Sequence, residues 1–220
     1  MELKDIDYFS KIEQHNPAVF NLATKSLLIS NKNEQDSIEI QRRLLLLSKS
    51  TGNEHLRQCS NFLAEVISYC ELFSQGKDPH WVPESSSPTP DIQFACGDGQ
   101  MPVEVKHLNS PHDEHEALAS GRMWGGSVNP DYNDGIQKKI DEFIVSAKNK
   151  FLSHNKRINS KDNDESGVLY IFFSKSIDAS ITDTIPWQTK MEDRVRAIAE
   201  LTIGDKIDLI VRDIDKSFIE

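Results

Sequence analysis

The sequence predicts an α/β domain in which helices flank a mixed central sheet, preceded by a helical N-terminal extension. Two observations carry this prediction. Apolar residues recur at helical spacing up to about residue 75, and no proline interrupts this region after Pro17. Beyond residue 90, short alternating or continuous apolar segments are typical of strands, and helical segments separate them. No internal repeat is visible along the chain.

Three helices are predicted in the first third of the chain, near residues 17–30, 35–49 and 53–74. The third carries one apolar stripe, formed by Leu56, Cys59, Phe62, Leu63, Val66, Ile67, Cys70 and Phe73. Such a stripe is typical of an amphipathic helix that packs on an apolar surface. We therefore divide the chain into a helical extension, residues 1–52, and a core, residues 53–220.

A β-hairpin is predicted after the stretch at 76–90, whose prolines and serines disfavour helix. Polar and apolar residues alternate in DIQFAC and in MPVEVKHL, and CGDGQ between them suits a tight turn. Successive side chains of a strand point to opposite faces, so pairing would gather Asp91, Glu104 and Lys106 on one face. The intervening valines would enter the core.

The rest of the chain supplies the remaining helices and strands. We expect a long connection at 109–134, a helix at 134–153, a buried strand in VLYIFFSK, a helix near 188–201 and a last strand in KIDLIVRDI. A connection as long as the first is often functional. The alternation of helices and strands implies a mixed sheet.

The composition gives no sign of a membrane segment. Hydrophobic residues make up 37% of the chain, and no apolar run approaches the roughly 20 residues that cross a bilayer. The N-terminus is partly acidic and lacks the apolar stretch of a signal peptide, so we expect a cytoplasmic location. Cys59, Cys70 and Cys96 lack paired spacing, which argues against disulfides or structural zinc and favours core packing.

The net charge of −10 opposes attraction to a polyanion such as nucleic acid. The distribution of charge matters more, because basic residues are needed only where phosphates lie. One basic segment, residues 137–157, contains Lys138, Lys139, Lys148, Lys150, Lys156 and Arg157. This segment is either a nucleic-acid contact or a solvated helix face.

The polar residues of the predicted hairpin suit phosphodiester cleavage, which needs a neutralised phosphate, an activated water and support for the leaving oxygen. Asp91 and Glu104 could each give one oxygen to Mg²⁺, or to Mn²⁺ instead, leaving positions for water and a phosphate oxygen. Lys106 could orient or deprotonate the attacking water, or stabilise the transition state. Alternatively, Glu104 and Lys106 are merely solvated on a polar sheet face.

Pro90-Asp91, twelve intervening residues and Glu104-Val105-Lys106 resemble the signature of the PD-(D/E)XK, or restriction-endonuclease-like, nucleases. The resemblance implies that the aspartate opens one strand and that the E-x-K motif lies on the adjacent strand. The family core also has helices before and after this hairpin, followed by strand, helix and strand. The order predicted from about residue 53 to 213 is similar, and it covers roughly three-quarters of the sequence.

The resemblance also implies further site residues on the two flanking helices. Many members add an acid from the helix before the hairpin, for which Glu65 is the candidate and Glu84 the competitor. The helix after the hairpin often supplies a polar residue, which makes Gln137 a catalytic candidate and Lys139 a substrate-binding one. Gln137 could instead form a capping box at the start of that helix.

Together these features predict a metal-dependent nuclease that acts on DNA rather than RNA, in restriction, defence or repair. The preference for DNA comes from the family resemblance. Arg122 and Trp124, in a glycine-rich loop, could contact phosphate and stack on a base, or could have structural roles. The N-terminal extension could bind a second copy or a partner protein. The alternative is a catalytically silent interaction protein with the nuclease fold, which the acidic net charge favours.

Overall fold

The computed structural model describes residues 2–15, 17–31, 33–50, 52–85, 87–108, 130–161, 164–173, 193 and 195–213. The helices with both ends among the described residues are η1 (Leu3–Asp5), α1 (Asp7–His15), α2 (Pro17–Ser30), α3 (Glu34–Lys49), α4 (Gly52–Ser74) and α6 (Pro130–Ile158). The strands are β1 (Pro79–Trp81), β2 (Ile92–Cys96), β3 (Gly99–Leu108), β4 (Gly167–Phe173) and β5 (Ile207–Asp213).

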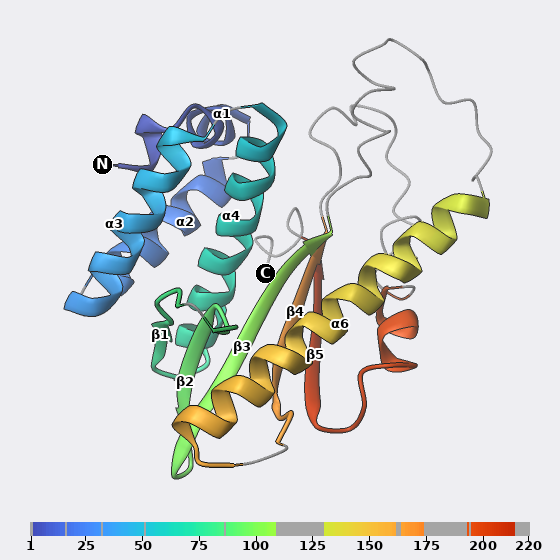
Figure 1. Cartoon of the computed structure of the whole chain (residues 1–220). Coiled ribbons are helices and arrows are strands. Elements are labelled where there is room, and N and C mark those ends of the chain that lie inside the picture. The colour runs from blue at the N-terminus through green and yellow to red at the C-terminus, as the bar shows by residue number, and fades with distance from the viewer. Residues whose placement is uncertain are drawn as a thin grey trace.

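The strands form one mixed sheet in the order β1-β2-β3-β4-β5. β2 pairs with β1 and β3 in antiparallel fashion, whereas β4 is parallel to both β3 and β5. A parallel pair needs a crossover connection, and α6 lies between β3 and β4 in the chain. Figure 1 shows α6 running across the sheet, on the side away from α4. The predicted α/β class with a mixed sheet is therefore confirmed.

Two apolar clusters cover the two faces of this sheet. Successive residues of β4 belong to different clusters: Tyr170 packs with α4 and β3, and Ile171 packs with α6 and β5. Because successive side chains of a strand point to opposite faces, the clusters lie on opposite sides of the sheet. β4 is buried along its whole length, as expected of a strand covered on both faces.

The N-terminal helices share the first of these clusters with the sheet. Phe9 of α1 and Ile40 of α3 are almost fully buried in the same cluster as Phe62 of α4 and Val103 of β3. α3 begins at an asparagine cap, because the Asn33 side chain accepts hydrogen bonds from two backbone amides of the first turn. The extension is thus packed on the core, and the proposed boundary at residue 52 remains a prediction.

Most predicted elements correspond to observed ones. The helices predicted at 17–30, 35–49 and 53–74 are α2, α3 and α4, the hairpin is β2 and β3, and the last two strands are β4 and β5. The helix predicted at 134–153 is longer at both ends, as α6. Of the helix predicted near 188–201, residues 193 and 195–200 are described and are helical. The short strand β1 was not predicted.

Two further predictions concern cysteines and membranes. Cys59 and Cys70 are buried, but Cys96 is exposed, so core packing was wrong for Cys96. The reason is its position at the end of β2, where the chain leaves the sheet for the turn at Gly97. All three are free thiols. In the part of the chain that the structure describes, no helix is long and apolar enough to cross a membrane.

Candidate active site

The pairing of β2 with β3 brings Asp91 beside Glu104. Ile92 is opposite Val103, and the backbone amide of Asp91 donates to the carbonyl of Val103 at 3.1 Å. The Asp91 side chain turns toward β3, where its Oδ2 accepts a hydrogen bond of 2.8 Å from the Val105 amide. Asp91 is therefore held at the start of β2 by the backbone of the adjacent strand, as the resemblance implies.

Glu104 is fully buried in the middle of β3. Its Oε1 lies 2.6 Å from the Lys106 ammonium and 2.6 Å from the Lys150 ammonium. Its Oε2 is also buried, and no hydrogen-bond partner for it exists among the described residues. The alternative that Glu104 is a solvated residue on a polar face is thus wrong.

Lys150 of α6 is one of two site residues that sequence reasoning missed, and Arg43 is the other. Its ammonium nitrogen lies 2.6 Å from Glu104 Oε1 and 3.7 Å from Asp91 Oδ1, so one cation contacts both carboxylates. The basic segment 137–157 contains this lysine, but its spacing does not distinguish Lys150 from its neighbours. The only available signal was that α6 follows β3 and must cross the sheet near the hairpin.

Glu65 of α4 is buried close to these residues and is bound by an arginine from the N-terminal extension. The Arg43 guanidinium forms an ion pair with Glu65 through Nη1, and its Nε donates to Glu39 at 2.8 Å. It also lies over the Trp81 ring, 4.9 Å from the ring centroid. The Glu65 side chain is only 13% exposed, so it faces the interior and not solvent.

The environment separates the pKa values of the three carboxyl groups. Burial, reinforced by the charge of Asp91, raises the pKa of Glu104 to about 7. Burial, with Asp91 and Glu104 adding repulsion, raises the pKa of Glu65 to about 8 despite its Arg43 partner. Burial acts in the same direction on Asp91, but the positive charges of Lys150, Lys106 and Arg43 outweigh it and lower its pKa.

Other candidate residues lie elsewhere. Glu84, the competitor of Glu65, is 69% exposed and pairs with Arg42 at 3.2 Å. Gln137 donates to Asp141, and it lies about 20 Å from Lys150 along the helix at 1.5 Å per residue, so the structure does not bring it to the carboxylates.

Three substrate-binding candidates add nothing to the site as described. Lys139 pairs with Glu142 at 3.2 Å on the exposed side of α6. Arg122 and Trp124 lie outside the described residues.

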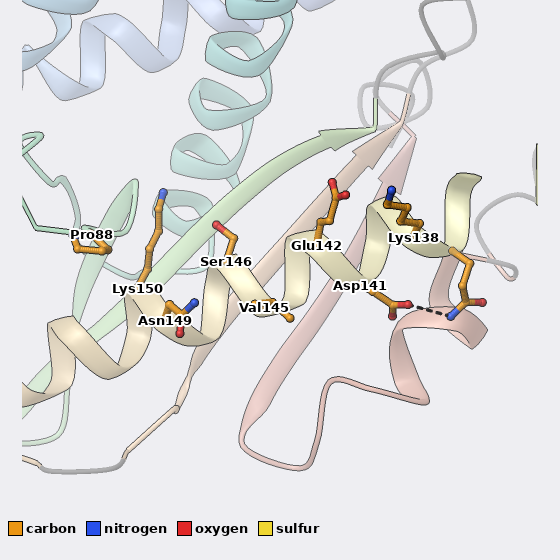
Figure 2. A pocket seen from close by; sticks show the side chains of 9 residues that line it. Pro88, Lys138, Asp141, Glu142, Val145, Ser146, Asn149 and Lys150 are labelled. Carbon is orange, nitrogen blue, oxygen red and sulfur yellow. Dashed lines mark hydrogen bonds between the residues drawn. The ribbon is translucent and has the colours of Figure 1, made fainter. Parts of the chain in front are cut away.

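A hollow of about 810 Å³ runs along α6 from the site, with Pro88 on its other side. Figure 2 shows Lys138, Glu142, Ser146 and Lys150 pointing to the same side of α6, with Lys150 nearest to Pro88. The lining carries two lysines and two acidic residues, so its charges balance. The predicted basic segment therefore does not form a uniformly positive groove in the part that is described.

The donor set fits a cation that takes few protein ligands. Among the described residues, no group of three or more histidine, cysteine or acidic side chains could hold a metal ion. Asp91 and Glu104 nevertheless share one ammonium, and Glu104 Oε2 is a buried carboxylate oxygen that has no hydrogen-bond partner in the described part of the chain. Mg²⁺ and Mn²⁺ suit such a pair, because Mg²⁺ is commonly held by one or two carboxylates and keeps several waters.

Comparison with models of protein families, with curated proteins and with solved structures finds no match for this chain. The resemblance to the PD-(D/E)XK nucleases therefore depends on the motif residues and the order of elements described above.

Proposed function

We propose that this chain is a metal-dependent nuclease of the PD-(D/E)XK kind, which hydrolyses phosphodiester bonds with Mg²⁺ or Mn²⁺. The main support is the full burial of Glu104 beside Asp91, with two ammonium groups within 2.6 Å of one oxygen. Buried ion pairs add little net stability, and apolar residues of the same size often do better. A cluster of buried charges within a sheet is therefore better explained by a chemical role.

Each residue has a proposed task. Asp91 and Glu104 would hold the divalent cation, which supplies neutralisation of the phosphate charge and activation of the attacking water. The lowered pKa of Asp91 keeps this carboxylate ionised at neutral pH, as a ligand must be. Lys106 keeps 23% of its side chain exposed next to Glu104, so its ammonium could face a bound phosphate.

The substrate and setting are proposed from the resemblance. DNA is favoured over RNA, and a role in restriction, defence or repair follows from the same resemblance. A cytoplasmic location is proposed as well. The net charge of −10 makes a partner protein that supplies basic residues useful for binding nucleic acid. Separately, the N-terminal extension could bind a second copy of the chain.

The test is cleavage of end-labelled single- and double-stranded DNA and RNA by the full chain with Mg²⁺, Mn²⁺ or EDTA. Asp91→Asn and Lys106→Met should each reduce the cleavage rate by at least about 100-fold, the lower range for a positioned acid, base or charge. Glu84→Gln is the matched control, because Glu84 is an exposed acid from the same region, and it should cleave at the wild-type rate.

Two results would remove the proposal. Cleavage that persists unchanged in Asp91→Asn and Lys106→Met would show that the activity belongs to another site or a contaminant. Binding of nucleic acid without cleavage under any metal condition would favour the alternative, a catalytically silent interaction protein that kept the fold.

A further inference from the structure

Lys150 has no role in the proposed chemistry, yet it contacts both of the carboxylates proposed to hold the metal ion. Its ammonium touches an oxygen of each carboxylate proposed to hold a cation, at 2.6 Å for Glu104 and 3.7 Å for Asp91. Two carboxylates from neighbouring strands thus already share one positive charge. That charge comes from a helix outside the motif.

When all its carboxyl groups are ionised, the cluster is balanced in charge without any metal ion. Three carboxylates, of Glu65, Asp91 and Glu104, face three cationic side chains, of Arg43, Lys106 and Lys150. Adding a divalent cation to a buried and neutral cluster would leave two positive charges uncompensated, which is costly at low dielectric. Departure of one of the three cationic groups would reduce this cost.

Lys150 is the group best placed to leave. Arg43 is held by Glu39, by Glu65 and by the ring of Trp81. Lys106 lies on the central strand β3 and contacts only one of the two proposed ligands, Glu104.

Open space next to Lys150 could receive its displaced ammonium group. Its side chain also lines the hollow along α6, beside Ser146 and Asn149 (Figure 2). A lysine stem of four carbons can move its ammonium into that space by rotating about its own bonds.

We infer that Lys150 is a built-in counter-ion that occupies the space between Asp91 and Glu104 and that a divalent cation displaces toward the hollow along α6. The inference rests on the proposed function, since it concerns the same pair of carboxylates. It implies that the chain binds its metal less tightly than the two carboxylates alone would. It also implies that the metal-free fold is stabilised by Lys150.

The test measures binding of Mn²⁺ to the full chain, by the electron paramagnetic resonance signal of free Mn²⁺, without any substrate. Lys150→Met should bind Mn²⁺ at least about tenfold more tightly than wild type, because a competing unit charge is gone. Lys150→Arg retains the charge and should bind no more tightly than wild type. Lys148→Met is the matched control, since Lys148 lies on the same helix and donates to the Thr202 carbonyl instead.

Thermal unfolding gives a second measurement. In EDTA, Lys150→Met should melt at a lower temperature than wild type, because Glu104 and Asp91 lose a shared partner. Mn²⁺ should raise the melting temperature of Lys150→Met more than that of wild type. Should Lys150→Met not fold in EDTA, refolding it with Mn²⁺ supplies the same comparison.

The outcomes separate this inference from the proposed function. Unchanged or weaker Mn²⁺ binding in Lys150→Met, with normal binding and cleavage in wild type, overturns the inference and leaves the nuclease proposal standing. Tight binding in Lys150→Arg also overturns it, since the charge would then not be the cause. Absence of Mn²⁺ binding in both wild type and Lys150→Met overturns both.

Discussion

Arg43 offers a direct test of how the N-terminal extension supports the site. In Arg43→Met a side chain of similar length remains, but the charge and the hydrogen bonds are lost. Arg43 is only 11% exposed, and it forms an ion pair with Glu65 and donates to Glu39. The substitution therefore leaves Glu65 buried without its cationic partner.

The expected loss follows from these contacts. Removing one partner of a buried ion pair costs about 3–5 kcal/mol. Glu39 limits the loss, because Arg42 still donates to it at 2.9 and 2.7 Å. Glu65 limits it further, since a carboxyl group with a raised pKa can take up a proton when its partner leaves. We therefore expect Arg43→Met to lower the free energy of unfolding by about 3 kcal/mol at pH 7, and by more at pH 9.

The assay is urea unfolding followed by tryptophan fluorescence, with Arg42→Met as the matched control. Arg42 precedes Arg43 on α3, but its side chain is 37% exposed. Arg43 would still bind Glu39 in the Arg42→Met variant. The control should lose less than about 1 kcal/mol, because Arg42 is partly exposed and the buried Glu39 keeps Arg43 as its partner. A double-mutant cycle with Glu65→Gln should show a coupling of about 1–3 kcal/mol. Equal losses in Arg43→Met and Arg42→Met would refute the reasoning.

Two further predictions concern the packing of α6 on the sheet. A Cβ added at Gly167 would lie 2.5 Å from the ring of Phe151. Gly167→Ala should therefore lower the free energy of unfolding by about 1–3 kcal/mol. A urea midpoint equal to that of wild type would contradict this contact. Burial and the charge of Arg157 lower the pKa of His154 from 6.5 to about 4, so the folded state holds this ring neutral. Between these pH values His154 binds a proton in the unfolded state but not in the folded state. The free energy of unfolding therefore falls by about 3 kcal/mol as the pH falls from 6.5 to 4. His154→Gln should flatten the stability profile in that window, and an unchanged slope would show that His154 is not responsible.

The elements that could be predicted are those whose pattern is local. The hairpin is specified by alternation within β2 and β3 and by the turn between them, and it brings Asp91 beside Glu104. β4 is specified by a continuous apolar run. In contrast, β1 has three residues within a proline-rich stretch, so period-two alternation cannot be recognised there.

The residues that could not be predicted are those whose position depends on packing between distant elements. Arg43 is one of two adjacent arginines on α3, and only the packing of α3 against α4 and β1 decides which one turns inward. Lys150 is one of several basic residues on α6, and the crossing of α6 over β3 decides that it reaches Glu104. Helical spacing gives the face of a residue relative to its own helix, but not the part of the sheet that this face meets.

This division between local and distant information bears on function as well as on fold. The motif supplies two of the three carboxylates, whereas two of the three cations that balance them come from helices outside it. The same motif on another scaffold could therefore be open to a divalent cation or already neutralised by the protein. The presence of Asp91, Glu104 and Lys106 alone does not distinguish an active nuclease from a silent relative. On our proposal, the two differ in whether a metal ion can displace the Lys150 ammonium, because Asp91 and Glu104 could hold a cation for phosphate chemistry only after Lys150 has left them.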